Sequence, residues 1–267
     1  MFRAFVIFCI FGSVLSLNAQ TQYLNDIHSD TVLANDQEIF FSLPYDIADE
    51  NSANRYFTDA NYQYQKGNLD YASSLMKKAI KKQPNRYEYH QLQAFILMDL
   101  GDHKASVKHA ERAVLLNSDD WKLLYCLGLT KYAAKDFLGA NIEYSRGMEV
   151  DPGQYLLYEG RAYTKTELND PLGALSDFDL AIMIKPTYIK AYQGRGMVNF
   201  KLGKYREAVA DFTSVLLREP ENANALYYRG VSRKLLGDVV NACLDFEKSS
   251  KLGKVEALKE LKNACSR

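Results

Sequence analysis

The sequence lacks several features that would decide its class at once. It carries no net charge, because 33 Lys and Arg balance 33 Asp and Glu in 267 residues. This balance argues against a dedicated nucleic-acid binder, which needs an excess of basic residues. With 15 glycines and 6 prolines, collagen-like and low-complexity classes are excluded. The 4 cysteines form no Cys-x-x-Cys pair, so no zinc or redox motif is present. The rest, 47% hydrophobic and 25% charged, is typical of a globular protein.

Patterns for catalysis are also missing. No Gly-x-Ser-x-Gly segment occurs, and the glycines near Lys204 lack the spacing and the Ser or Thr of a phosphate-binding loop. His103 and His109 are six residues apart, so they do not share a helix face as a metal-ligand pair would. We interpret His90 as an aromatic substitute in a helix contact. The sequence predicts no catalytic residue, no metal and no cofactor, and we expect that the protein is not an enzyme.

Residues 1–19 have the pattern of a secretory signal peptide. Arg3 precedes an apolar run from Ala4 to Leu17, and Ala19 supplies a small residue at the cleavage point. An uncleaved anchor is the weaker alternative, since the run is short of the ~20 apolar residues of a spanning helix. We expect cleavage near Ala19, no membrane span afterwards, and a periplasmic or secreted protein.

Residues 20–52 differ from the rest of the chain. They contain seven acids and no Lys or Arg, and an apolar cluster runs from Ile39 to Tyr45. We expect a mostly irregular arm. It either caps the following segment or folds back onto it, and the sequence does not decide between the two.

From residue 53 onward the chain repeats with a period of 34 residues. The eighth position of six successive frames is always Ala or Gly: Ala60, Ala94, Gly128, Ala162, Gly196 and Gly230. The twentieth is always small: Ala72, Ser106, Ala140, Ala174, Ala208 and Ala242. The thirty-second is proline in four frames: Pro84, Pro152, Pro186 and Pro220.

Each frame predicts a pair of helices. Glycine near the fifteenth position in four frames can take the left-handed conformation that ends the first helix. In the fourth frame Asn169 and Asp170 precede Pro171, which predicts an N-cap at Asp170 and a helix that begins at the proline. Small residues let the two helix axes approach, and the proline ends the second helix.

These residues resemble the tetratricopeptide repeat family, which has small residues at positions 8 and 20 and proline at position 32. The resemblance implies an all-α fold, a right-handed α-solenoid of six helix-turn-helix repeats plus a C-terminal capping helix. The predicted segments are the signal peptide 1–19, the arm 20–52, the repeats 53–86, 87–120, 121–154, 155–188, 189–222 and 223–256, and the cap 257–267.

A charged pattern marks the last three repeats. Position 7 is arginine where position 23 is aspartate, and the antiparallel helices place these positions at facing heights. Because an Arg fork can hold a carboxylate with two hydrogen bonds, we predict structural ion pairs between Arg161 and Asp177, Arg195 and Asp211, and Arg229 and Asp245.

The resemblance also implies a partner-binding groove, because the first helices of this family line its concave side with positions 2, 5, 9 and 12. The predicted groove residues are Phe57, Asn61, Tyr64, Phe95, Lys122, Tyr125, Tyr132, Tyr163, Lys190, Phe200, Tyr227 and Lys234. Aromatic residues at positions 5 and 12 also occur for packing alone, and that alternative stays open. The Lys and Asn clamp of the chaperone-binding members is not present.

The sequence therefore predicts an exported, non-enzymatic scaffold that binds a peptide segment or helix of another protein in a tyrosine-rich groove. The alternative is a structural assembly component of the cell envelope or secretion machinery, bound through its convex face or cap. Oligomeric state is not predicted. Cys243 and Cys265 are expected to be neighbours, with free thiols favoured over a disulfide because the required Cα separation is narrow.

Overall fold

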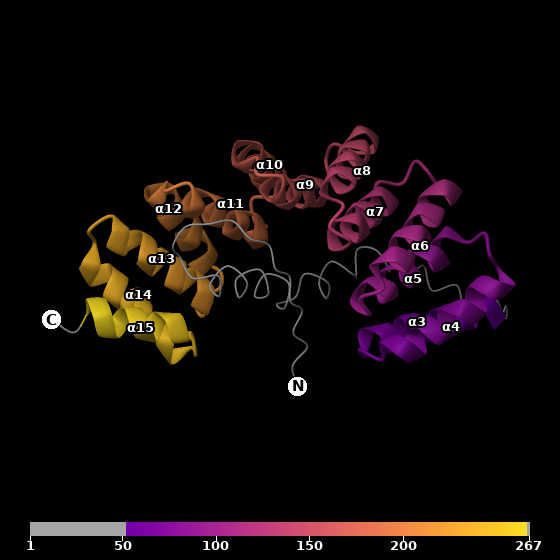
Figure 1. The fold of residues 1–267 in the computed structure, drawn as a ribbon, viewed down its shortest axis with the longest axis horizontal. Coiled ribbons are helices and arrows are strands. Elements are labelled where there is room, and N and C mark those ends of the chain that lie inside the picture. Colours follow the sequence, from indigo (N-terminus) through magenta and orange to yellow (C-terminus); the bar gives the residue numbers. More distant parts are fainter. Residues whose placement is uncertain (1–51, 266–267) are drawn as a thin grey trace. The chain divides into compact units, whose positions relative to one another are not determined.

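The structure is a computed structural model, and it describes residues 52–265. The predicted signal peptide and acidic arm lie outside these residues. The described residues form thirteen α-helices and no strand (Figure 1). The helices are α3 (Ser52–Gln65), α4 (Leu69–Lys82), α5 (Tyr87–Asp99), α6 (His103–Leu116), α7 (Trp121–Ala133), α8 (Phe137–Val150), α9 (Tyr155–Glu167), α10 (Pro171–Ile184), α11 (Ile189–Lys201), α12 (Tyr205–Leu216), α13 (Ala223–Leu235), α14 (Val239–Lys251) and α15 (Val255–Ala264).

The helices pack in consecutive pairs. Each first helix, from α3 to α13, packs most extensively against the second helix that follows it, and each second helix packs against the next first helix. First helices of neighbouring pairs also contact one another directly. This arrangement confirms the predicted all-α solenoid of six helical pairs followed by one further helix.

Short turns with a left-handed residue join the two helices of each pair. The φ angles of Gly67, Gly101, Gly203 and Gly237 lie between 73° and 86°, where glycine has no steric penalty. In the fourth pair Asn169 takes this conformation with φ 59°. Asp170 then caps α10 by accepting a hydrogen bond from the Gly173 amide at 2.9 Å, with Pro171 as its first residue. The predicted start of this helix is confirmed.

The core depends on close approach between helices. Tyr144 of α8 is fully buried, and its ring lies against Gly128 of α7 and Gly160 of α9. A Cβ atom at either glycine would come within 2.5 to 2.6 Å of this ring, closer than non-bonded carbons allow. Phe178, Phe212 and Phe246 are buried in the same way in the following pairs.

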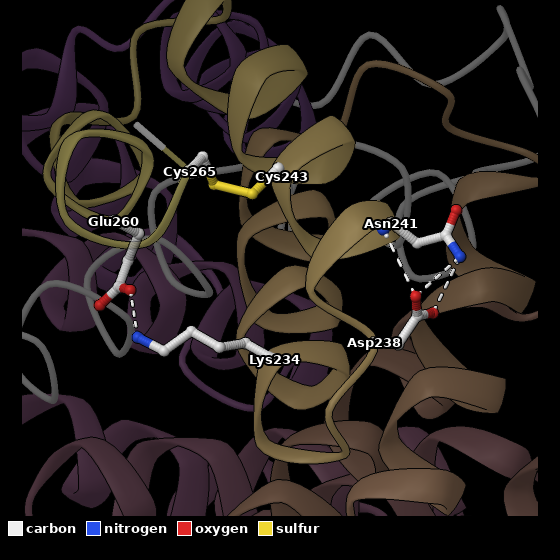
Figure 2. The surroundings of a disulfide bond; sticks show 6 residues. All are labelled: Lys234, Asp238, Asn241, Cys243, Glu260 and Cys265. Atoms are coloured by element: carbon white, nitrogen blue, oxygen red, sulfur yellow. Dashed lines mark hydrogen bonds and ion pairs between the residues drawn. A yellow bond between two sulfur atoms is a disulfide. The ribbon is translucent and has the colours of Figure 1, made fainter. Parts of the chain in front are cut away.

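The last helix is fixed by a covalent bond. Ala257 of α15 is buried against Phe246 and Ala242 of α14, and Cys243 and Cys265 form a disulfide with a Cα separation of 5.8 Å (Figure 2). The expectation of free thiols is therefore wrong, because α14 and α15 hold the two Cα atoms within the narrow range that a disulfide needs.

A histidine pair joins α5 to α6. His90 Nε2 donates to the Pro84 carbonyl at 2.9 Å, because a carbonyl oxygen can only accept. His90 Nδ1 therefore carries a lone pair and accepts from His109 Nδ1, 3.0 Å away. Burial lowers the pKa of both rings, to about 4 for His109, which also faces His90 and the cations Lys108 and Lys77. Both rings are neutral in the folded protein.

This pair predicts a loss of stability at acidic pH. Unfolded histidine titrates near pH 6.5, so below that value the unfolded chain binds protons that the folded chain does not. Stability is then complete above about pH 6.5 and falls as the pH drops toward about 4, by on the order of 2–3 kcal/mol. His109→Gln keeps a donor toward His90, and its free energy of unfolding, measured with urea between pH 7 and pH 4, should depend less steeply on pH. If the free energy of unfolding fell equally with pH in both proteins, the histidine pair would not be the cause of the acid sensitivity.

Candidate interaction surface

Four aromatic residues of the predicted groove lie in the core. Their side chains are only 3–5% exposed: Phe57, Tyr64, Phe95 and Tyr125. Phe57 stacks on Tyr89 of the next pair at 5.0 Å between ring centroids, and the Tyr64 hydroxyl donates to Asp99 at 2.8 Å. The groove prediction is corrected at these positions, where the packing alternative holds.

The other four aromatic residues are half-buried, each against a ring beneath it. Tyr132 of α7 meets the edge of Phe137 at 5.3 Å, and Tyr163 of α9 meets Phe178 at 5.2 Å. Phe200 of α11 and Tyr227 of α13 pack on Tyr228. One side of each ring is fixed by the core, while part of its area stays accessible. Rigid aromatic rings of this kind supply contact area at low entropic cost.

Burial keeps two of these tyrosines neutral. Burial raises the pKa of Tyr227 to about 12, and the carboxylates Glu260 and Glu256 add to the rise. Burial, with a smaller contribution from Glu167, also raises the pKa of Tyr132. Both hydroxyl groups therefore act as neutral donors and acceptors at physiological pH.

The predicted lysines are half-buried on three first helices, Lys122 on α7, Lys190 on α11 and Lys234 on α13. The Lys234 ammonium donates to Glu260 of α15 at 2.5 Å (Figure 2). Its charge is therefore neutralised within the protein and holds the last helix in place.

Four amide side chains on the first helices have a buried atom without a hydrogen-bond partner among the described residues. The atoms are Asn61 Oδ1 on α3, Gln91 Nε2 and Gln93 Oε1 on α5, and Asn224 Oδ1 on α13. Asn61, Gln91 and Asn224 occupy positions that the 34-residue pattern assigns to the inner surface. An unpaired buried polar group is costly, and these atoms are shielded from solvent. The sequence pattern identified Asn61 but missed Gln91 and Asn224.

The arginine ladder is present. Arg161 donates to both oxygens of Asp177 at 2.9 and 2.7 Å, and Arg229 does the same to Asp245 at 3.0 and 2.7 Å. Arg195 binds Asp211 at 2.6 Å, and its third nitrogen reaches Asp179 of the preceding pair at 2.6 Å.

Each arginine also tethers two neighbouring pairs. Arg161 reaches Ser145, and Arg229 reaches Thr213, each in the preceding second helix. In the third pair, where Leu127 replaces the arginine, the buried Glu143 instead binds Lys131 at 2.6 Å. Lys131 stands at position 11 of its frame, four residues after the position that arginine occupies in later repeats, so the pattern at position 7 did not predict this pair. The ladder is thus structural, and it leaves the first-helix surface to other side chains.

Within residues 52–265 no cluster of three or more His, Cys, Asp or Glu could hold a metal ion. In the same range no helix combines the length and apolarity of a membrane span.

Two segments match models of one family, described as tetratricopeptide repeat. One match covers residues 87–120, the second 34-residue frame, and the other covers residues 194–249. The fold is that of a tetratricopeptide repeat solenoid. No curated protein matches the sequence significantly.

Solved structures share this tetratricopeptide repeat fold at low sequence identity. PilF of Pseudomonas aeruginosa superposes with a TM-score of 0.68 at 16% identity, covering 79% of this chain and 96% of PilF. A tetratricopeptide repeat protein from Parabacteroides merdae superposes with a TM-score of 0.63 at 19% identity, covering 93% of this chain and 98% of that protein. YrrB is a tetratricopeptide repeat protein described as having an unusual peptide-binding site. It superposes with a TM-score of 0.56 at 19% identity, covering 70% of this chain and 97% of YrrB. The tetratricopeptide repeat fold indicates a scaffold for protein–protein interaction.

Proposed function

We propose that the protein is an exported, non-enzymatic scaffold that binds an extended segment or helix of a partner protein along its first helices. The accessible parts of the aromatic rings on the first helices carry this proposal. Four successive first helices, α7, α9, α11 and α13, each contribute one such ring, so a segment that ran along the surface could meet the rings in turn.

The half-buried rings of Tyr132, Tyr163, Phe200 and Tyr227 lie on the same series of helices. They would supply the apolar contact area, since buried aromatic anchors carry much of the energy of protein interfaces. YrrB, which has the same fold, supports a peptide as the ligand.

Export is part of the proposal. The pattern of residues 1–19 supports it, and so does the disulfide between Cys243 and Cys265, since disulfides persist mainly in oxidising compartments. Affinity purification from an envelope fraction is therefore the route to the partner.

The test compares variants of the two surfaces with that partner. We expect Tyr163→Ala to weaken binding by about tenfold or more, the size of a hot-spot loss. Ile142→Ala, on an exposed position of the second helix α8, should leave affinity unchanged. Thermal melts of both variants show whether the fold is retained. Unchanged affinity for folded Tyr132→Ala and Tyr163→Ala variants would rule out the first-helix surface.

A second function is favoured by one observation. Apolar side chains are exposed on the last pair and on α15, including Val240, Leu244, Val255 and Leu258. They suit the alternative of an assembly component of the cell envelope or secretion machinery, bound through its convex face or cap. Loss of binding only on changing these residues would favour that alternative.

A further inference from the structure

A cleft opens between α12, α13 and α14, and none of its lining residues belongs to the first-helix surface proposed above. Its volume is about 280 Å³, and its apolar lining comes from Leu216, Leu217, Pro220, Leu226 and Leu244. Leu217 and Leu244 are 77% and 59% exposed, so large apolar side chains stand at the entrance. Exposed apolar area around a cavity of this kind is a frequent mark of an interaction site.

The repeat explains why this space is empty. Tyr158 and Tyr192 precede Leu226 at intervals of 34 residues, and each hydroxyl donates to a proline carbonyl at 3.1 Å, Pro152 and Pro186 respectively. His90 makes the same contact with Pro84. Leu226 faces the equivalent Pro220 with neither a ring nor a donor.

Two arginines lie over the Tyr192 ring, and one of them has an equivalent at the cleft. The guanidinium groups of Arg195 and Arg218 lie 5.6 and 5.9 Å from the ring centroid, an attractive cation–π geometry. Arg218 corresponds to Leu252 one repeat later. Arg195 corresponds to Arg229, which lines the cleft, where Asp245 holds it in place. The cleft thus keeps the apolar walls, the carbonyl and one cation of an internal aromatic site without the aromatic side chain.

We propose that this cleft binds a tyrosine side chain from a partner protein, with its hydroxyl donating to the Pro220 carbonyl and its ring against Arg229. Lys248 also lines the cleft, whereas Asp245 is committed to Arg229 and Arg233. The charged residues of the lining, Arg229, Lys248 and Asp245, therefore sum to a positive charge. The tyrosine is therefore flanked by acidic residues in the partner. This site is independent of the proposed first-helix surface.

The probe is the peptide acetyl-Asp-Tyr-Asp-amide, added to the full chain with leucine methyl groups labelled for NMR. We expect saturable ring-current shifts at Leu217, Leu226 and Leu244, with half-saturation near the millimolar range that a single anchor provides. Acetyl-Asp-Leu-Asp-amide and acetyl-Lys-Tyr-Lys-amide should bind several-fold more weakly.

Leu226→Tyr is the decisive variant, because it restores the internal ring. We expect it to abolish binding of the probe and to raise the melting temperature. Leu138→Tyr, at an exposed site on α8, is the control and should bind as the unaltered protein does. Leu244→Trp should block the cleft from its entrance, so the test does not depend on how well Leu226→Tyr folds.

Absence of saturable shifts in the unaltered protein would overturn the proposal. It would also be overturned if Leu226→Tyr and Leu244→Trp bound the probe as tightly as the unaltered protein does. The chain has exposed tyrosines of its own, Tyr62 and Tyr71. If the protein self-associated with increasing concentration and Leu226→Tyr abolished that association, the cleft would bind a tyrosine of a second copy of this chain. That result would also contradict the proposal of a different partner protein.

Discussion

Replacing Arg195 with alanine is expected to lower the free energy of unfolding by about 3–5 kcal/mol, the cost of leaving a buried charge unpaired. Asp211 is only 3% exposed, and Arg195 supplies three of its hydrogen bonds, which reach both carboxylate oxygens. Asn199 is then its remaining partner in the ladder, at 3.1 Å, and an amide does not neutralise a carboxylate. The change also removes the bond to Asp179 of the preceding pair.

Urea denaturation of single and double variants measures this effect. Arg195→Ala combined with Asp211→Ala should be less destabilising than Arg195→Ala alone, because no unpaired charge remains. Arg195→Lys should recover only part of the loss, since an ammonium cannot hold both carboxylate oxygens as a guanidinium does. A loss below about 1 kcal/mol for Arg195→Ala would place the pair with weak surface ion pairs and refute its structural role.

Reduction of the disulfide between Cys243 and Cys265 is expected to cost about 3 kcal/mol. The two residues are 22 apart in the sequence, and loop-closure entropy for that length predicts this magnitude. The loss should begin at α15, because that helix buries little besides Ala257 and is held otherwise by the ion pair of Lys234 with Glu260. Hydrogen exchange should therefore rise first in α15 and at the end of α14.

Denaturation with and without reductant tests this expectation. The double variant Cys243→Ser, Cys265→Ser serves as the control and should not respond to reductant. Cys126, a buried free thiol, is present in both proteins, so any effect of the reductant on this thiol appears in both and cancels in the comparison. An identical denaturation midpoint for the unaltered protein in both conditions would show that the bridge adds no stability.

The sequence was sufficient to predict the fold because every repeat satisfies the same local constraints. Glycine or Asn169 at the turn, the cap at Asp170 and small residues at helix crossings each specify a feature that needs no distant partner. Lys135 is the exception, since it takes a left-handed φ of 63° that its residue type does not indicate. Here the repeat context overrides the preference of the residue.

The interaction surface was harder to predict, for a physical reason. Positions on one face of a first helix point either toward the next pair or toward solvent, and a small rotation of the helix decides between the two. Phe57 is buried against Tyr89 of the next pair and Tyr125 against Tyr144 of its own pair, whereas Tyr163 keeps accessible area. Aromatic residues suit both situations, so the pattern alone could not separate them.

Contacts that depend on the exact approach of two helices were likewise beyond the sequence. Glu143 finds Lys131 where the arginine ladder is interrupted, and Cys243 meets Cys265 because α15 packs closely on α14. Both contacts need distances that a 34-residue period does not supply.

Site-specific photocrosslinking in living cells tests the central claim, that the first helices bind a partner protein. A photoreactive phenylalanine analogue is placed at Tyr163, on first helix α9, or at Ile142, an exposed position of second helix α8. The account predicts a discrete crosslinked partner from position 163 and none from position 142. The same partner crosslinked from position 142 and not from position 163 would contradict it.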